Sequence, residues 1–457
     1  MFDTFQSRHF TFMVYVSGFF FYLLIPPIRN AEHTQYFLIL HTVHALCGIF
    51  LLRSFSESPS PRVLTLLFIM TRIAVFGFYP WLSDDVFGYL FYGNATLHGA
   101  NLYSLTADNP LLMHLRDSAY DLMAFKQYQN IYPPVATMFM TLSAWIASWF
   151  HSSLFNSLLI WKILLFCCEG FGLWLLWKTL EEHEKSFFPI LLYLAIPLTA
   201  IEGVGQAHNE ILLLPILAGI IRITMNWKGK THAIMIGVLC ALAGLIKLYP
   251  FVLILPIMMQ KMSIKESILT IVSCLTTILV ASLPWFSGVM YGDMSAIAGY
   301  ISVLSFYNGT YFNGVILYLF RFSFEALAIQ EWWLLAPKAV SIVRLCSIIG
   351  MSVLARIKHY ALPFSLFLVL CIAVCISPKV HTWYLIPIMF LGSMYSIKSL
   401  PILSGIMMLT YGMYAIDPAV ESMFFEIILW MIMSITIFLE YKGALQIFNG
   451  GQSKVLT

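Results

Sequence analysis

Long apolar runs separated by short polar connectors recur along the whole chain. A helix needs about 20 apolar residues to cross a bilayer, with a range of about 17–25. The runs lie at 10–27, 35–52, 63–80, 133–150, 157–177, 187–201, 208–225, 232–248, 249–260, 266–285, 337–354, 361–377, 382–396, 400–416 and 423–440. This pattern predicts an all-α integral membrane protein, a helical bundle with about 13–15 apolar segments.

Two connectors are much longer than the others. Residues 81–132 and 286–336 are rich in Tyr, Asn and Gly, and they have room for helices that lie at the membrane surface. Basic residues collect in the other set of connectors: Arg8, Arg53, Arg62, Arg222, Lys228, Lys230, Lys261, Lys265, Arg356, Lys358, Lys398 and Lys442. Since cytoplasmic connectors carry the excess of Lys and Arg, we expect both long loops on the periplasmic or extracytoplasmic side of the inner membrane.

Successive connectors alternate between the two sides of the membrane. For the basic connectors all to lie on the cytoplasmic side, one apolar segment must not cross. Segments 187–201 and 249–260 are short for a crossing, and Pro197 interrupts the first. We therefore expect a broken or re-entrant helix at 187–201, which is tolerated where it lines a cavity of the protein. The run at 10–27 lacks an A-x-A cleavage site and is interpreted as a retained anchor. We treat residues 1–457 as one transmembrane domain.

Composition agrees with a membrane protein and excludes several functions. The chain of 457 residues is 60% hydrophobic and 10% charged, whereas soluble domains carry about 25% charged residues. A net charge of +3 gives no reason to expect nucleic-acid binding. The eight cysteines form neither a CxxC pair nor a zinc-like spacing with histidine.

Asp84 and Asp85 follow the third apolar run directly and open the first long loop. With Ser83 they resemble the start of a helix, where acidic side chains are stabilised by the positive end of the helix dipole. The alternative is a catalytic base at the mouth of a cavity, with its pKa raised by desolvation. Tyr89 and Tyr92 continue the loop and are candidate substrate contacts.

The stretch 202–210, EGVGQAHNE, is a second polar cluster between two apolar runs. Gln206, His208, Asn209 and Glu210 are either capping residues of a helix or contacts to a sugar or phosphate at its N-terminus.

Cationic and aromatic residues supply the remaining candidates. Lys247 ends an apolar segment and either snorkels to the interface or faces a phosphate. In the stretch 377–387, Lys379 and His381 add positive or titratable groups, and Trp383 and Tyr384 add aromatic faces that an interfacial belt also explains. Because all these clusters fall on the same predicted side, we expect one shared cavity.

An ordered set of motifs resembles the bacterial polyprenyl-phosphate-mannose-dependent mannosyltransferases of the GT-C superfamily. The motifs are SDDVFGYLFYG, ANLY, IYPP, GQAHNE, GLIKLYP and SPKVHTWYLIP, within residues 80–390. The resemblance implies a GT-C-type bundle whose general base is an acid in the first large outer loop, and Asp85 matches that acid. His208, Asn209 and Glu210 match the family's H-N-D, and Lys247 matches its intramembrane lysine.

The sequence departs from the family pattern at two positions of the first motif. Gly88 stands where the family has Arg, and Tyr92 stands where it has a second Asp. These differences bear on the acceptor and the donor sugar.

The resemblance implies an inverting glycosyltransferase. A sugar, best matched by mannose, passes from a polyprenyl-phosphate donor to a lipid-linked or saccharide acceptor at the outer membrane face. Asp85, beside Asp84, is the expected base. The expected ligands of the donor phosphate are Lys247, His208, Lys379 and His381. The expected substrate contacts are Tyr89, Tyr92, Gln206, Asn209, Glu210, Trp383 and Tyr384.

Other interpretations remain open. No cofactor or metal is required, although Asp84 with Asp85 can bind a divalent cation. A multi-span transporter or flippase for a lipid-linked saccharide also places broken helices near a cavity, and a polysaccharide polymerase or ligase uses similar substrates.

Overall fold

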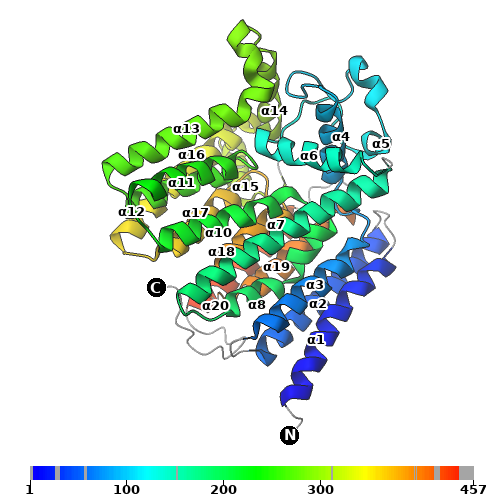
Figure 1. Ribbon diagram of the computed structural model, residues 1–457, viewed down its shortest axis with the longest axis vertical. Helices are drawn as coiled ribbons and strands as arrows, with labels where there is room; N and C mark the ends of the chain where they lie inside the picture. The colour runs from blue at the N-terminus through cyan, green and yellow to red at the C-terminus, as the bar shows by residue number, and fades with distance from the viewer. Residues whose placement is uncertain are drawn as a thin grey trace. The chain divides into compact units, whose positions relative to one another are not determined.

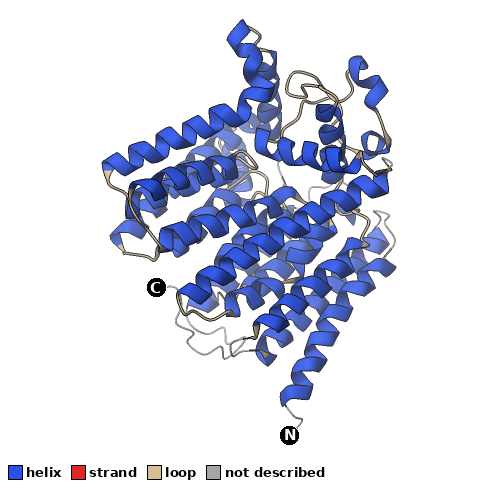
Figure 2. Ribbon diagram, viewed as in Figure 1, coloured by secondary structure: helices blue, strands red, loops and turns tan. Residues whose placement is uncertain are grey.

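The computed structural model describes residues 4–25, 31–55, 59–150, 153–309, 312–395, 397, 399–415 and 423–441. Every element assigned in these residues is a helix, apart from one isolated β-bridge between Phe312 and Lys379. Figure 2 shows the same all-helical character. Within the described residues, each predicted apolar run overlaps one helix or several consecutive helices, so the predicted all-α fold class is confirmed. Residues 26, 27, 396 and 416 of these runs lie outside the described residues.

The described residues form two compact units, and each draws on several stretches of the chain. Unit 1 comprises 1–82, 170–206 and 380–457, and unit 2 comprises 83–169 and 207–379. Helix α7 (Leu154–Glu182) contributes residues to both.

Unit 1 contains the first three helices and the C-terminal helices (Figure 1). Its α-helices are α1 (Thr4–Phe21), α2 (Ala31–Ser54), α3 (Pro61–Phe76), α8 (Phe188–Leu194), α9 (Pro197–Ala200), α18 (Ile386–Ser393), α19 (Leu400–Met408) and α20 (Met423–Tyr441). A π-helical turn covers Ile201–Gly205, and 3₁₀ helices cover Tyr22–Leu24, Thr382–Leu385 and Leu409–Ala415.

Unit 2 contains both long loops predicted from the sequence. Its α-helices are α4 (Asp85–Leu97), α5 (Ser118–Leu122), α6 (Pro134–Ala147), α10 (Leu214–Met225), α11 (Lys230–Gly244), α12 (Ile254–Lys261), α13 (Ile264–Phe286), α14 (Ser295–Gly309), α15 (Val315–Ala326), α16 (Trp332–Ile357) and α17 (Leu362–Cys375). Its 3₁₀ helices cover Pro110–Leu115, Asn209–Leu213, Tyr249–Leu253 and Ser287–Tyr291.

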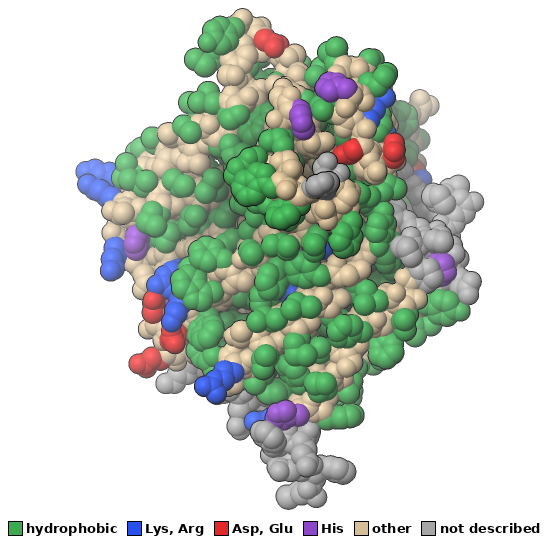
Figure 3. All heavy atoms as spheres, turned by 45° about the vertical axis from the view of Figure 1, so that its right-hand side comes forward, with side chains coloured by type: hydrophobic (Ala, Val, Ile, Leu, Met, Phe, Trp, Pro, Cys, Tyr) green, Lys and Arg blue, Asp and Glu red, His purple; other side chains and the backbone are tan. Residues whose placement is uncertain are grey.

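Several helices have the length and apolarity of membrane spans. In the described part of the chain, four pass both criteria: His33–Ser54, Leu154–Glu182, Ile264–Tyr291 and Trp332–Ile357. Many of the other predicted runs form shorter apolar helices of 10–17 residues. Along α13 the side chains of Ile268, Leu275 and Leu279 are 54%, 60% and 64% exposed, and hydrophobic side chains cover much of the face in Figure 3. Such a surface suits a multi-pass membrane protein, because a soluble protein rarely exposes apolar patches this large.

The interruption predicted at Pro197 is present. Phe188–Leu194 and Pro197–Gly205 meet at a bend of 70°. Side chains from the neighbouring helices of unit 1 form hydrogen bonds at the break. The Tyr15 hydroxyl donates to the Leu194 carbonyl (2.9 Å), which the break leaves without its helical partner, and Arg72 Nη2 donates to the Thr199 side chain (3.0 Å). A break in an apolar segment is stable when protein groups replace the lost helical hydrogen bonds.

The two long loops meet inside unit 2. Tyr103, from the first loop, contacts the rings of Trp285, Phe286 and Tyr300 at the end of α13 and in α14, with centroids 5.0–6.0 Å apart. The Asn101 side-chain amide also donates to the Trp285 carbonyl (2.7 Å). The predicted grouping of the loops on one side of the membrane is compatible with this contact.

Candidate active site

The two acids lie where the first loop turns into α4. Asp84 occupies the N-cap position but makes no capping hydrogen bond with its side chain, and Asp85 is the first helical residue. The Ser83 hydroxyl accepts from the Asp85 amide instead (3.3 Å). The Tyr89 hydroxyl, one turn further along, lies 3.5 Å from Asp85 Oδ2. Neither carboxylate is therefore used in the capping bond that the simpler interpretation of SDD requires.

Backbone hydrogen bonds bring distant parts of unit 2 to this point. The amides of Val135 and Ala136, in the first turn of α6, donate to the carbonyl of Leu245 at the end of α11 (3.0 and 3.1 Å). Pro133 and Pro134 precede them and have no N–H group to satisfy. This pairing fixes the segment that carries Lys247 beside the segment that carries Tyr132.

A second hydrogen bond fixes the segment before His208. The Trp161 indole N–H, on α7, donates to the Ala207 carbonyl (2.9 Å). Ala207 has a φ of 64°, a left-handed conformation that is uncommon for a residue with a Cβ. The chain turns sharply there, and His208 becomes the N-cap of the 3₁₀ helix Asn209–Leu213.

A buried ion pair joins two of the predicted residues. Lys247 Nζ lies 2.9 Å from Glu210 Oε1, with side chains 12% and 0% exposed. The same ammonium group lies 5.1 Å from the centre of the Tyr132 ring, within the range of a cation–π contact. Lys247 therefore points into the protein, and it does not snorkel to the membrane surface.

Asp85 is at the centre of the electrostatic interactions among the predicted site residues. Its side chain is half-buried. Burial raises the pKa of the Asp85 carboxyl group, whereas the nearby His208 and Lys247 act to lower it. The pKa of Lys379 falls to about 8 because of burial, and Asp85 opposes that shift. Residues from four separate stretches of the sequence are thus brought together around the carboxyl group of Asp85.

Asn209 is a buried polar residue with unsatisfied hydrogen-bonding groups. Its side chain is 0% exposed, and neither the amide nitrogen nor the amide oxygen has a hydrogen-bond partner among the described residues. A buried polar group without a partner costs about 1–3 kcal/mol. A substrate hydroxyl that entered the site would recover part of this free energy.

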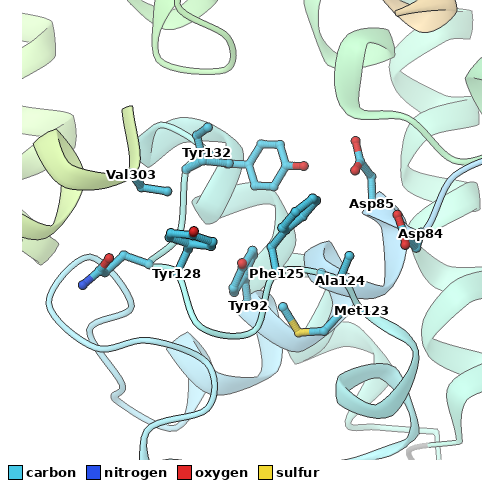
Figure 4. Close-up of a pocket in the computed structure, with 12 residues that line it drawn as sticks. Asp84, Asp85, Tyr92, Met123, Ala124, Phe125, Tyr128, Tyr132 and Val303 are labelled. Atoms are coloured by element: carbon cyan, nitrogen blue, oxygen red, sulfur yellow. The ribbon is translucent and has the colours of Figure 1, made fainter. Parts of the chain in front are cut away.

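A pocket opens beside the two acids (Figure 4). Its lining residues are Asp84, Asp85, Gly88, Tyr92, Met123, Ala124, Phe125, Tyr128, Gln129, Ile131, Tyr132 and Val303. In Figure 4 the hydroxyl of Tyr132 and the carboxylate of Asp85 point into the same space. The free volume is about 50 Å³, which holds a few water molecules but no sugar ring. Phe125, with a φ of 56°, is one of the residues that line this small space.

Four predicted site residues belong to unit 1. The Gln206 side-chain oxygen accepts from the Leu82 amide (2.9 Å). The rings of His381 and Trp383 stack with centroids 4.2 Å apart, and His381 meets Tyr384 edge-on at 5.4 Å. Their predicted place in the same cavity as Asp85 stays a prediction.

The sequence analysis missed several residues that shape these sites. Tyr132 and Tyr128 line the acid pocket, and in unit 1 the Thr382 hydroxyl donates to Glu202 (2.8 Å) and bonds to the Tyr411 hydroxyl (3.0 Å). Glu202 is fully buried within an apolar segment, which was a signal for a specific partner. Tyr128 carried no such signal, since tyrosine is common throughout this chain.

The described residues contain no group of three or more His, Cys, Asp or Glu side chains arranged to hold a metal ion. In the described part of the chain, Asp84 with Asp85 is thus a pair of acids without a third ligand of these types.

Comparison with known proteins gives one family match. The model described as alpha-(1→6)-mannopyranosyltransferase, N-terminal domain, matches residues 29–263. The matched region contains Asp85, His208 and Lys247, whereas Lys379 lies beyond it. No curated protein matches the chain. The family match covers 235 of 457 residues, slightly more than half of the chain.

Proposed function

Because this chain belongs to the alpha-(1→6)-mannopyranosyltransferase family, we propose that it transfers mannose from a polyprenyl-phosphate donor to a lipid-linked or saccharide acceptor, with Asp85 as general base. The observation that carries this proposal is the position of Asp85 beside His208, Lys247 and Lys379. An acceptor hydroxyl requires a carboxylate that can take its proton. A departing phosphate requires cationic groups that stabilise its charge.

In the proposed reaction, an acceptor oxygen attacks the anomeric carbon while its proton passes to Asp85. The bond from the anomeric carbon to the phosphate oxygen breaks on the opposite face, and the configuration inverts. Burial raises the pKa of Asp85, which brings a weak base closer to the operating pH and improves proton transfer. A general base of this kind contributes about 10²–10⁴-fold to the rate.

The leaving group is a polyprenyl phosphate, which gains negative charge as the bond breaks. Lys379 and Lys247 are the proposed cations that stabilise this charge. Lys247 is held by Glu210, so its position is fixed before the donor binds. Preorganised charges of this kind stabilise a transition state without a further cost of reorganisation. His208 and the unsatisfied amide of Asn209 supply further hydrogen-bonding groups.

The apolar helices support the proposed lipid-carried donor, and the basic residues support the proposed side of the membrane. A lipid-carried sugar suits a chain with several long apolar helices, because the prenyl chain stays in the bilayer while the sugar phosphate reaches the loops. The distribution of Lys and Arg supports an extracytoplasmic position for those loops. A transporter or flippase would move the lipid-linked saccharide without breaking its glycosyl–phosphate bond.

The test is a transfer assay with purified full-length protein, a radiolabelled polyprenyl-phosphate mannose and short mannoside acceptors. We expect Asp85→Asn to lower kcat about 10²–10⁴-fold while donor binding is retained. Asp121→Asn, an exposed acid of the same loop on α5, is the matched control and should transfer normally.

Two outcomes would contradict the proposal. Normal turnover by Asp85→Asn removes this residue from the role of base. If the unmodified protein moves labelled donor across vesicles but never cleaves it, the activity is transport.

A further inference from the structure

The second long loop reaches the candidate active site at two points. Val303, on α14, is buried and lines the pocket beside Asp85 (Figure 4). Further along the loop, Phe312 forms a parallel β-bridge with Lys379. All four residues belong to unit 2. A loop that is distant from Asp85 in sequence thus contacts both the pocket and the segment that carries a proposed phosphate ligand.

The peptide group that links Pro378 to Lys379 is held by two hydrogen bonds. The Phe312 amide donates to the Pro378 carbonyl (3.1 Å), and the Ser377 hydroxyl accepts from the Lys379 amide (3.4 Å). Proline disfavours the helical conformation of the residue before it, and α17 ends at Cys375. The chain is therefore extended at this point, and the second loop fixes the orientation of the peptide group from which the Lys379 side chain starts.

An apolar cluster anchors the same two segments further from the site. Its buried residues are Leu317 on α15 and Ala336 and Val340 on α16, and Ile376 packs against them. Figure 1 shows α16 beside both α15 and α17. Because Ile376 lies two residues before Pro378, the cluster limits the movement of this segment relative to the second loop.

The second loop comes closest to the Lys379 segment at Gly314. A Cβ added there would lie 2.4 Å from the Pro378 carbonyl oxygen and 2.9 Å from the carbonyl carbon. These are backbone atoms, which cannot rotate away as a side chain can. Asn313, the residue before, is fully buried and has a φ of 54°. The φ of Gly314 itself is −100°, a negative value that alanine also adopts, so lack of space is what requires glycine here.

The side chain of Lys379 connects this backbone contact to the proposed base. It is half-buried, burial lowers its pKa to about 8, and the Asp85 carboxylate is close enough to oppose that shift. In a preorganised site, a misplacement of about 1 Å can cost about 10²-fold in rate. The position of the Lys379 ammonium group therefore depends on how closely the second loop packs against Pro378.

We propose that Gly314 is a positioning residue, whose missing side chain lets the second long loop pack against Pro378 and hold Lys379 beside Asp85. This inference rests on the proposed function for the role of Lys379. It adds that a residue outside the family-matched region 29–263 acts on the departing phosphate indirectly, by fixing where the ammonium group lies.

The first experiment is a double-mutant cycle in the transfer assay with the full-length protein. We expect Gly314→Ala to lower kcat about 10- to 100-fold, because the added Cβ displaces the segment of Lys379. If this effect passes through Lys379, Gly314→Ala causes no further loss in the Lys379→Ala background. The matched control is Gly48→Ala in unit 1, whose Cβ would lie 2.2 Å from the Ala195 carbonyl oxygen. Any loss that it causes should be the same with and without Lys379.

The second experiment measures the environment of Lys379 without turnover. Acetic anhydride reacts with the uncharged amine, and mass spectrometry of the labelled peptide at a series of pH values gives the pKa of Lys379, about 8 in the unmodified protein. In Gly314→Ala the pKa should rise toward the ordinary value of about 10.4, because the displaced ammonium group regains water. Phe312→Ala removes a half-buried side chain without introducing a clash and should raise the pKa less. Gly48→Ala should leave it unchanged.

The outcomes separate the inference from the proposed function. Independent losses of kcat in Gly314→Ala and Lys379→Ala, or a pKa of Lys379 that neither loop variant changes, would show that Gly314 has only a structural role. If Gly314→Ala does not fold, Phe312→Ala decides the question in both experiments. If the unmodified protein transfers no sugar, the proposed function fails, and the labelling still tests whether the second loop positions Lys379.

Discussion

Asp85 and Lys379 show how single residues in this site depend on their surroundings. The same burial that raises the pKa of the carboxyl group lowers that of the ammonium group, since a low dielectric disfavours both charged forms. The charge of Asp85 opposes the shift at Lys379, and His208 and Lys247 oppose the shift at Asp85. The site therefore holds ionisable groups whose pKa values lie closer to neutral pH than usual.

This arrangement predicts a bell-shaped pH dependence of kcat/KM. Asp85 must be ionised to accept a proton, so the rate should fall as the pH drops through its raised pKa, above the ordinary value of about 3.9. Lys379 is charged only below its pKa of about 8, so donor use should fall as the pH rises through that value. The measurement is a pH–rate profile of the unmodified protein and of Lys379→Arg.

The arginine variant tests the assignment of the alkaline limb. A guanidinium group stays charged at all practical pH values, so Lys379→Arg should extend activity above pH 8. An alkaline limb that stays in place would show that another group causes it.

At the scale of elements, α11 and α13 approach closely because small residues line their contact. A Cβ added to Gly237 would overlap Ser273 Oγ and the Thr270 carbonyl oxygen. Two hydrogen bonds cross the interface, from Thr270 Oγ1 to the Ala233 carbonyl (2.9 Å) and from Ser273 Oγ to the Ile234 carbonyl (3.1 Å). Small residues and interhelical hydrogen bonds are the usual basis of helix packing in membranes. This contact supports the helix that leads into Lys247.

We predict that Gly237→Ala lowers the free energy of unfolding by about 1–3 kcal/mol, the usual cost of overpacking. The matched control is Gly350→Ala on α16, where an added Cβ meets nothing within 4 Å. It should be neutral or stabilising by up to about 1 kcal/mol, since alanine favours the helix. Thermal unfolding in detergent measures both, and equal effects would rule out the close contact as the cause.

At the scale of the whole molecule, the distribution of basic residues predicts which side of the membrane the long loops face. We predict that a cysteine at His98, an exposed residue after α4, reacts with an impermeant maleimide from outside intact spheroplasts. A cysteine at Lys261, an exposed residue at the end of α12, should react only after the membrane is opened. The native cysteines are replaced by alanine in both variants. Reversed labelling would place the proposed site on the cytoplasmic side.

The sequence predicted the helices because burial in lipid imposes a strict local rule. An apolar run of sufficient length forms a helix wherever it occurs, so runs such as 266–285 and 337–354 lie within α13 and α16. Pro197 indicated a break for an equally local reason, since proline cannot continue the hydrogen-bond ladder. The order of motifs in residues 29–263 also carried the family assignment.

Only the tertiary structure decided which side chains meet. Asp85, His208 and Lys247 are far apart in the chain, and hydrogen bonds such as Trp161 to Ala207 and Val135 to Leu245 bring their segments together. Spacing along the chain contains no information about such contacts. Neither the Glu210–Lys247 ion pair nor the buried amide of Asn209, which has no hydrogen-bond partner among the described residues, could be inferred from it. Helix formation follows from residues close in sequence, whereas burial and ionisation depend on neighbours that only the folded chain supplies.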